Sequence, residues 1–377
     1  MNIHDLPTPA LLLDLDILEN NLARMQKRID GFGVALRPHI KTHKCLEIGK
    51  RQRQLGSRGI TVSTFYEAEQ FAQAGFDDIT WAFPLPPVYA GKVAELGRKI
   101  RLGVVIDSKE AVEHLVTAST QSHSPVHVWL KVDCGYHRAG VDPQSPGAEG
   151  LVQFLSDSSP LIFDGILSHS GHAYNGKSRA EILAAANEER TVMVDFADRM
   201  RSKGYRIPAV STGSTPAVSV IENLNGVTEV RPGNYCFHDN TMVALGVCDV
   251  RDCAVSVLTS VVSHQAHAEH FIVDAGALAL SKDMGATHID AENGLGVLFE
   301  DYPNKNLYRN VKLRTLSQEH GKVVASATSS IEGKFRVGEK VRVLENHSCL
   351  TVAHFDEYAV VREEEVVDHW RILRGRS

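Results

Sequence analysis

A short basic stretch, 36–44, carries the residue types that are most able to do chemistry. It reads LRPHIKTHK and holds two lysines, two histidines and an arginine, after an apolar segment and before a helical pattern. A lysine amine can hold a carbonyl cofactor covalently, and Lys41 is the candidate for that linkage. The alternative for the same residues is a solvated basic loop, so the rest of the chain must decide between the two.

A second stretch, 211–216, reads STGSTP and has the composition of an anion-binding loop. Small residues let backbone N–H groups approach a phosphate, the hydroxyls add donors, and a short helix is expected after Pro216. The segment RPGNY, 231–235, would supply further donors if it follows the adjacent strand. An ordinary strand-to-helix turn is the alternative.

A third candidate is the pair His347 and Cys349, which follows the strand-like run KVRVLEN. If the strand continues, residues two apart point to the same face. An imidazole and a thiolate together suit Zn²⁺, although another divalent metal is not excluded by the pair. Two protein ligands leave positions for water or substrate, which is the catalytic arrangement of a zinc site. Buried residues without a metal are the alternative.

Alternating strand-like and helical runs must position these residues. Strands are expected at 8–16, 33–37, 59–64, 78–83, 101–107, 127–133, 161–169, 209–214 and 227–233, and helices at 17–29, 44–55, 65–75, 88–99, 109–120, 148–157, 179–203 and 217–223. Asp16 is expected to cap the first helix. About eight apolar strand-helix units indicate parallel strands with helical crossovers, and so a (β/α)8 barrel.

In such a barrel, functional groups lie at the C-terminal ends of the strands. The repeated placement of polar residues at these ends is therefore informative, although no single one is specific. The candidates are Arg37, His39, Lys41, Thr64, Asp107, Asp133, Arg138, His169, His172, Tyr174, Thr212, Gly213, Ser214, Thr215, Arg231, Gly233, Asn234 and Tyr235.

Near residue 245 the pattern changes to strand-like runs joined by turns. These runs are 253–265, 270–280, 322–329, 340–346 and 357–373, and they indicate an antiparallel β domain. We therefore expect a barrel over 18–245 and a β domain over 246–377 that also includes an N-terminal strand in 1–17. The turn LSQEHG, 316–321, is assigned no chemistry from its pattern.

Composition excludes several classes of protein. The 377 residues are 43% hydrophobic and 23% charged, which is typical of a globular protein. The net charge of -6, without a basic block, argues against a nucleic-acid partner. No stretch is apolar over the roughly 20 residues that a membrane span needs. The acidic start lacks the basic region of a signal peptide, and the six scattered cysteines form no CxxC pair, so a reducing, cytoplasmic location is expected.

The motifs together resemble the D-serine dehydratase and D-threonine aldolase family, which are pyridoxal 5'-phosphate enzymes of the alanine racemase fold. The likeness covers nearly the whole chain, through TPALLLDLD, LRPHIKTHK, GITVSTFYEAEQF, GFDDITWAFPLP, VWLKVDCGYHRAGV, SHSGHAY, STGSTP, VTEVRPGNYCFHD, VDAGALALS, LSQEHG and NHSC. It implies a fold type III barrel with a C-terminal antiparallel β domain, and a homodimer.

The resemblance also implies roles for individual residues. Lys41 would be the Schiff-base lysine, Arg138 would contact the ring hydroxyl, His169 would pack on the ring, and Tyr174 would line the pocket. Arg231 stands where alanine racemases place an arginine against the pyridine nitrogen. Zn²⁺ would be held by His347 and Cys349. The phosphate would be bound by Thr212, Gly213, Ser214, Asn234 and Tyr235.

The activity implied by the resemblance is β-elimination of water from a D-β-hydroxy amino acid, giving pyruvate and ammonia if the substrate is D-serine. The H-x-C pair is similar to the dehydratase branch, because the D-threonine aldolases usually have H-x-D there. Two nearer alternatives are D-threonine aldolase and D-threo-3-hydroxyaspartate dehydratase. A non-catalytic carrier of the cofactor is a third.

Overall fold

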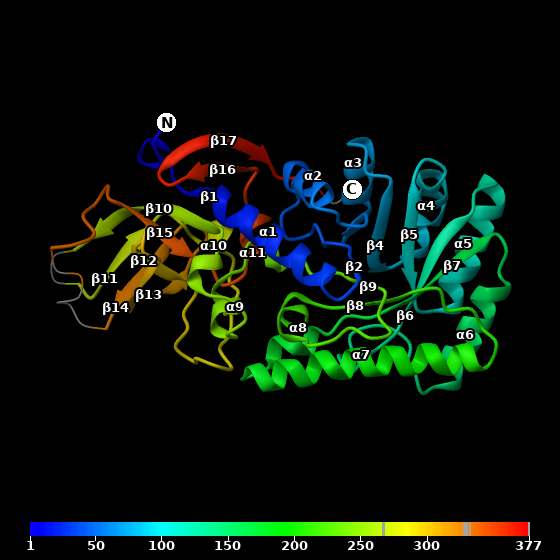
Figure 1. The fold of residues 1–377 in the computed structure, drawn as a ribbon. Helices are drawn as coiled ribbons and strands as arrows, with labels where there is room; N and C mark the ends of the chain where they lie inside the picture. The colour runs from blue at the N-terminus through cyan, green and yellow to red at the C-terminus, as the bar shows by residue number, and fades with distance from the viewer. Residues whose placement is uncertain (266–267, 327–330, 332, 376–377) are drawn as a thin grey trace. The chain divides into compact units, whose positions relative to one another are not determined.

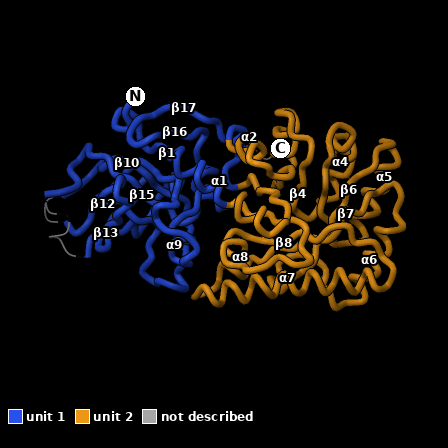
Figure 2. Tube along the Cα trace, in the orientation of Figure 1, with its two compact units in different colours: residues 1–24, 42–47, 234–374 blue, residues 25–41, 48–233, 375–377 orange. Residues whose placement is uncertain are grey.

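The computed structural model describes residues 1–265, 268–326, 331 and 333–375. The chain forms two compact units, which Figure 2 shows in different colours. The barrel unit comprises 25–41, 48–233 and 375–377, and the β unit comprises 1–24, 42–47 and 234–374. The chain therefore passes between the two units several times instead of crossing one linker. The division expected at 17/18 and 245/246 stays a prediction.

The barrel unit is built on an eight-stranded sheet in the order β2-β9-β8-β7-β6-β5-β4-β3, and every adjacent pair is parallel. Its two edges meet through a parallel bridge between His39, just beyond β2, and Thr61 of β3. The predicted (β/α)8 architecture is thereby confirmed. The strands are β2 (Ala35–Leu36), β3 (Ile60–Val62), β4 (Asp78–Pro84), β5 (Arg101–Ile106), β6 (Val126–Lys131), β7 (Leu161–Leu167), β8 (Val210–Thr212) and β9 (Glu229–Val230).

Helices alternate with these strands where apolar residues recur at helical spacing. They are α1 (Leu15–Asp30), α2 (Leu46–Gln54), α3 (Phe65–Gln73), α4 (Ala90–Gly97), α5 (Lys109–Ser122), α6 (Pro146–Asp157), α7 (Arg179–Ser202) and α8 (Thr215–Val220), and Figure 1 shows α7 as the long green helix. The prediction that Asp16 caps the first helix is wrong. The helix begins at Leu15, two residues earlier than expected, and the carboxylate of Asp14 accepts the N–H of Ile17 at 3.2 Å.

The β unit is built on a nine-stranded sheet in the order β11-β14-β13-β12-β15-β10-β1-β16-β17. Its neighbouring strands are antiparallel except for β1 and β16, which pair in parallel. The strands are β1 (Ala10–Asp14), β10 (Val255–His264), β11 (His270–Val273), β12 (Val297–Asp301), β13 (Asn306–Leu316), β14 (Gly321–Ala325), β15 (Lys340–Leu344), β16 (Glu357–Arg362) and β17 (Glu365–Arg371).

Several details of this sheet differ from the sequence-based expectations. The run 270–280 is a strand only as far as Val273, and its end forms the short helix α10 (Ala277–Leu280). The run 357–373 divides into the hairpin β16–β17, and β12 and β13 were not expected at all. Of the predicted run 322–329, residues 327–329 lie outside the described residues. Two further short helices are α9 (Asn240–Ala244) and α11 (Ser348–Val352).

Arg37 lies away from the end of the barrel where the other candidates gather. Its guanidinium pairs with Asp78 at 2.7 Å and with Glu229 at 3.0 Å, and these carboxylates begin β4 and β9. Arg37 is 2% exposed, and its two ion pairs hold the pKa of its guanidinium above the ordinary value in spite of burial. It therefore joins strands at the N-terminal end of the sheet, away from the end that carries active sites in such barrels.

No helix within the described ranges is both long enough and apolar enough to cross a membrane.

Candidate active site

The C-terminal ends of the barrel strands bring several of the predicted residues together. His169, just beyond β7, is partly buried, and its pKa is held well below the ordinary value by burial and by the charges of Lys41, Lys131, Arg138 and Arg231. The imidazole is therefore neutral. The positive charge of these four side chains near one ring favours an anionic ligand.

Lys131 ends β6 inside this group and was not predicted as a site residue. It is 8% exposed, and burial, reinforced by Arg231, lowers the pKa of its amine to about 8. Its stem packs closely against the chain, because a Cβ on Gly140 would lie 3.0 Å from the Cγ of Lys131. It was not selected from the sequence, because it lies inside the predicted strand 127–133 and not at its end.

Thr212 is the last residue of β8, and Gly213 and Ser214 follow it in the loop before α8. Gly213 has a φ of +96°, which only glycine adopts readily, and its N–H donates to Oε2 of Glu189 at 3.2 Å. Ser214 occupies the N-cap of α8 but its hydroxyl makes no capping bond, unlike Ser108, Ser145 and Ser178 at other helix starts. The Ser214 hydroxyl donates instead to the carbonyl of Ser170, at 3.3 Å.

Glu189 supports this loop and the one before it. Its carboxylate, buried on α7, accepts hydrogen bonds from the hydroxyls of Ser168 at 2.7 Å and Ser170 at 2.6 Å, as well as from Gly213. Sequence reasoning missed this residue because it lies in the middle of a helical run with no motif around it. Its function is to fix the two loops that follow β7 and β8.

Arg231 connects three strand ends rather than pointing freely into the barrel. Its Nη1 donates to the hydroxyl of Ser211 and to the carbonyl of Thr212, and its Nη2 donates to the carbonyl of Ser168. The guanidinium is buried, which lowers its pKa. These bonds engage both terminal nitrogens of Arg231.

Other strand-end candidates have local structural roles. Thr64 caps α3 by accepting the N–H of Glu67, Asp107 accepts the N–H of Gly140, and Asp133 accepts those of Gly135 and His137. Tyr174 is partly buried in the short 3-10 helix 171–175. Each of these contacts shapes a loop at the end of the barrel.

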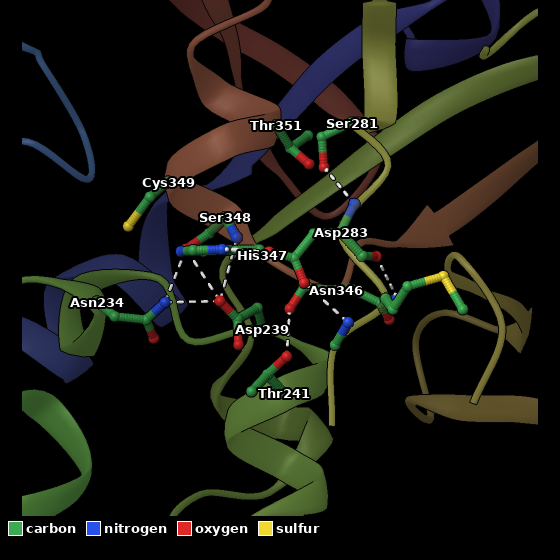
Figure 3. A network of polar contacts seen from close by, with 12 residues as sticks. Asn234, Asp239, Thr241, Ser281, Asp283, Asn346, His347, Ser348, Cys349 and Thr351 are labelled. Atoms are coloured by element: carbon green, nitrogen blue, oxygen red, sulfur yellow. Dashed lines mark hydrogen bonds and ion pairs between the residues drawn. The ribbon is translucent and has the colours of Figure 1, made fainter. Parts of the chain in front are cut away.

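The β unit contains the pair His347 and Cys349, but not on a continuing strand. β15 ends at Leu344, and His347 becomes the N-cap of α11 with φ −148° and ψ 96°. The expectation that both side chains project from one strand face is therefore wrong, and a strand-to-helix turn positions them instead. Figure 3 shows this turn with the side chains around it.

Two contacts orient the pair. His347 Nδ1 lies 2.9 Å from Oδ2 of Asp283, and Cys349 Sγ lies 3.1 Å from Oγ1 of Thr42, the residue that follows Lys41 in the chain. Burial opposes protonation of His347, but hydrogen bonds with Asp283 and Cys349 outweigh it and raise the pKa of the imidazole to about 11. Asp283 was missed, because its short SKDMG context has no recognisable pattern.

Asn234 belongs to the same network of the β unit. Asn234 Nδ2 donates to Asp239 at 2.6 Å and to the hydroxyl of Ser348 at 3.0 Å, while its Oδ1 has no hydrogen-bond partner among the described residues. The N–H of Ser348 also donates to Asp239, at 3.1 Å (Figure 3). Tyr235 is 1% exposed. The side-chain amide nitrogen of Asn234 therefore braces the His347 turn.

Comparison with known proteins places the chain in a family. The family model for the N-terminal domain of alanine racemase matches residues 13–241, and the one for a putative serine dehydratase domain matches residues 254–361. D-serine dehydratase of Dictyostelium discoideum is 37% identical over 97% of this chain and 96% of its own length. The chain belongs to the D-serine dehydratase family.

Solved structures agree with this family assignment. D-threo-3-hydroxyaspartate dehydratase from Delftia sp. HT23 has a TM-score of 0.93 and 35% identity, covering 99% of both chains. Alanine racemase from Bacillus anthracis has a TM-score of 0.71 at 15% identity, covering 98% of both chains, which shows the shared fold alone. As a member of the family, the chain is a pyridoxal-phosphate-dependent lyase.

The residues of the barrel unit fit that cofactor. Lys41 would provide the amine, while Arg138, Arg231 and Lys131 would provide the positive charge that a phosphate and a ring phenolate require. The neutral, partly buried imidazole of His169 would provide an uncharged aromatic surface.

The donor set of the β unit fits a metal ion with open positions. A carboxylate bonded to His Nδ1 leaves Nε2 for a metal, which is the usual arrangement around zinc. Within the described part of the chain, no three His, Cys, Asp or Glu side chains are grouped to hold a metal. His347 and Cys349 would be protein ligands, with the other positions left to water or substrate.

Proposed function

We propose that this protein eliminates water from D-serine to give pyruvate and ammonia, with pyridoxal 5'-phosphate and Zn²⁺ as cofactors. The observation that carries the proposal is the His347–Cys349 turn, in which Asp283 fixes one imidazole nitrogen and leaves the other for a metal. Cofactor chemistry alone supports racemisation, whereas elimination of hydroxide requires an acid at the β-oxygen. His347 and Cys349 would bind the metal ion that acts as this acid.

The barrel residues have complementary roles in the proposal. Lys41 Nζ holds the cofactor and, once released by the substrate amine, takes the α-proton from one face, which restricts the reaction to one enantiomer. The Ser214 hydroxyl and the Thr212–Ser214 backbone bind the phosphate together with Asn234 and Tyr235. The cofactor, when bound, withdraws the electrons left at the α-carbon.

Other barrel residues hold the ring in the orientation that this proton transfer needs. Arg138 contacts the ring hydroxyl, His169 packs against the ring, and Tyr174 lines the substrate pocket. The Arg138 guanidinium lies 5.1 Å from the ring centroid of Tyr136, which limits the positions that it can adopt. Cations near the ring also disfavour protonation of His169, so this residue contributes surface without charge.

His347 and Cys349 bind the metal, and its Lewis acidity, when present, weakens the bond between the β-carbon and its hydroxyl. Asp283 keeps His347 in the tautomer that presents Nε2, and Thr42 holds the sulfur of Cys349. One solved structure of the related D-threo-3-hydroxyaspartate dehydratase is a cysteine-to-alanine mutant in the metal-free form. Another is a histidine-to-alanine mutant, and the mutated histidine lies two positions before that cysteine. That spacing supports the same pair here.

The decisive experiment supplies D-serine, D-threonine and D-threo-3-hydroxyaspartate separately, with and without a chelator. Pyruvate from D-serine, lost on chelation and restored by Zn²⁺, is the expected result. Full elimination by metal-free enzyme would refute the metal role. Glycine and acetaldehyde from D-threonine, without any keto acid from D-serine, would refute the dehydratase assignment.

A second candidate is dehydration of D-threo-3-hydroxyaspartate to oxaloacetate. The enzyme of that name from Delftia sp. HT23 is 36% identical over 98% of both chains, so the similarity supports it almost as well as D-serine dehydration. An aldolase has weaker support, since the D-threonine aldolase of Arthrobacter sp. is 28% identical. The substrate panel separates all three by their products.

The proposed working form is a homodimer in the cytoplasm, as the family fold implies. None of the six cysteines, all within the described ranges, forms a disulfide, which is consistent with a reducing compartment. Sedimentation of the purified enzyme tests the oligomer, and a monomeric active species would refute it.

A further inference from the structure

Tyr136 lies in the loop after β6 and is assigned no contact with cofactor or substrate in the proposed reaction. Strands β6 and β7 pair in parallel as far as Lys131 and Leu167, and beyond these residues each continues into a loop of the candidate site. The first loop carries Arg138, and the second carries His169. Tyr136 is half-buried, and its ring contacts both of these side chains.

The ring of Tyr136 rests directly on Gly171, a buried residue of the second loop. A Cβ on Gly171 would lie 2.6 Å from Cδ1 of Tyr136 and closer still to Cε1 and Cζ. Nonbonded carbon atoms pack at about 3.5–4.0 Å, so a larger residue at position 171 would displace the ring. The φ of Gly171 is not positive, so glycine is needed here for space and not for an unusual backbone conformation.

The two side chains that would contact the cofactor ring pack on different parts of Tyr136. The Arg138 guanidinium lies 5.1 Å from the ring centroid, within the range of a cation–π contact. The ring of His169 lies 6.1 Å away at an interplanar angle of 79°, which is an edge-to-face arrangement. The Tyr136 ring therefore limits where Arg138 can lie relative to His169.

Each of the two loops is held in shape by its own hydrogen bonds. In the first loop, Asp133 accepts the N–H groups of Gly135 and His137, at 3.0 and 2.9 Å. In the second loop, Glu189 accepts the hydroxyl of Ser170 at 2.6 Å. These bonds give each loop a defined shape, but they do not connect one loop to the other.

Glu188 of α7 lies beside both loops but is expected to connect them weakly. Its Oε2 lies 3.6 Å from Nε2 of His172, and a Cβ on Gly135 would lie 3.4 Å from its Oε1. The side chain of Glu188 is 57% exposed, and an ion pair at such a position contributes little. The closely packed ring of Tyr136 is the stronger connection.

We propose that Tyr136 is a positioning residue for the cofactor ring. Its aromatic ring, seated on Gly171, holds Arg138 and His169 at a fixed separation, and this separation decides how the two residues meet the cofactor. This role rests on the proposed function, which assigns Arg138 to the ring hydroxyl and His169 to the face of the ring. Tyr136 acts through these two side chains.

The position of Arg138 should control the protonation of the ring hydroxyl of bound pyridoxal phosphate. A guanidinium at that oxygen favours its anionic form, which absorbs at longer wavelength than the neutral form. Without the aromatic ring beside it, Arg138 can take other staggered rotamers. The ratio of visible to near-ultraviolet absorbance of the bound cofactor therefore reports on Arg138, separately from the stability of the fold.

The test compares Tyr136→Ala with Tyr136→Phe, each purified with pyridoxal phosphate bound. In Tyr136→Ala the absorbance ratio should fall, and kcat should fall by about 10- to 100-fold, since a misplacement of about 1 Å can reduce a rate by about 100-fold. Tyr136→Phe keeps the ring and should restore both values. An unchanged ratio and kcat in Tyr136→Ala, whatever its stability to denaturant, would overturn the proposal. Equal losses in Tyr136→Phe would also overturn it, because the hydroxyl would then carry the effect.

Gly171 provides a second test of the same contact. Gly171→Ala should lower the absorbance ratio, whereas the control Gly150→Ala should not, because the added carbon on α6 would meet no described atom within 4 Å beyond its own stretch of helix. In the Tyr136→Ala background, Gly171→Ala should have little further effect, since the ring that it displaces is gone. If Gly171→Ala alone fails to fold, adding Tyr136→Ala should restore folding. A full additional loss in that background, or no restoration, would contradict the proposal.

The spectra need no substrate, which separates the positioning role from the proposed function. An unmodified protein that binds no pyridoxal phosphate would refute the proposed function and the positioning role together. The same absorbance ratio in the unmodified protein and in Tyr136→Ala, with cofactor bound to both, would refute the positioning role alone.

Discussion

The contact between His347 and Asp283 is the residue-scale feature that most directly separates this site from a plain cofactor pocket. A carboxylate on Nδ1 fixes the imidazole and increases the basicity of Nε2. We therefore expect Asp283→Asn to weaken Zn²⁺ binding by about 10- to 100-fold with cofactor binding unchanged. Competition with a chromophoric chelator measures this affinity.

The matched control for that change is Asp290→Asn. Asp290 is a carboxylate of the same unit whose side chain is 51% exposed and pairs with Lys312 at 3.2 Å. Metal affinity should be unaffected by this replacement. Equal losses in both variants would mean that the general negative charge, and not the bond to His347, controls binding.

The choice of Lys41 over Lys44 is also a residue-scale prediction. Lys41→Ala should remove the visible absorbance of bound cofactor after dialysis, because the covalent linkage is lost. Lys44→Ala should keep it. Lys44 has a φ of +48°, and its carbonyl accepts the N–H of Leu373 at 2.7 Å, so its backbone serves the β unit. Absorbance retained in Lys41→Ala would disprove the assignment.

At the scale of elements, the ion pairs of Arg37 connect the starts of strands β4 and β9. Removing one partner of a buried pair leaves an uncompensated charge, which costs roughly 3–5 kcal/mol. Arg37→Ala should lower the free energy of unfolding by about this amount, as measured with denaturant. The control Arg24→Ala breaks a pair with Asp252 whose arginine is 50% exposed, and it should cost less than about 1 kcal/mol.

The barrel elements could be predicted because their signals are strong. Strands such as Ile60–Val62 are short, apolar and followed by capped helices, so alternation alone indicates parallel strands. The elements of the β unit were harder to predict from the sequence. Strands β12 and β13 pair with register shifts, which break the alternating pattern, and Ala277–Leu280 is too short to show a helical period.

The residues of the site also divide into those that were selected from the sequence and those that were not. Lys41 and His169 were selected because parallel strands carry their C-terminal residues to one end of the sheet, and their roles stay predictions. Glu189 and Asp283 were not selected, because each contacts a partner far away in the sequence and lies in no motif. His347 and Cys349 stay a predicted metal pair, and a helix start, not the expected strand, positions them.

At the scale of the whole molecule, burial of Lys131 connects stability to pH. Its pKa of about 8 in the folded protein lies below the ordinary value of 10.5, so the unfolded chain binds the extra proton between these two values. The contribution of Lys131 to the free energy of unfolding is therefore lowest at low pH, and it increases as pH rises from about 8 to 10.5.

The variant Lys131→Met should lack this increase. Relative to the variant, the unfolding free energy of the unmodified protein should rise by up to about 3 kcal/mol across that interval. Paired denaturant titrations at several pH values measure the difference, in which other titrating groups cancel. If the free energies of unfolding of the two proteins change with pH in parallel, Lys131 is not responsible for the increase.

Strand β1 has a consequence for how the protein is made. Residues 10–14 lie inside the nine-stranded sheet, between β10 and β16, so the first strand synthesised has partners that begin near residues 255 and 357. At about 5–20 residues per second, ribosomes need roughly 20–70 s to supply the last of them. Throughout that time an apolar strand leaves the ribosome without a partner, and a factor that shields it would raise the yield of folded protein.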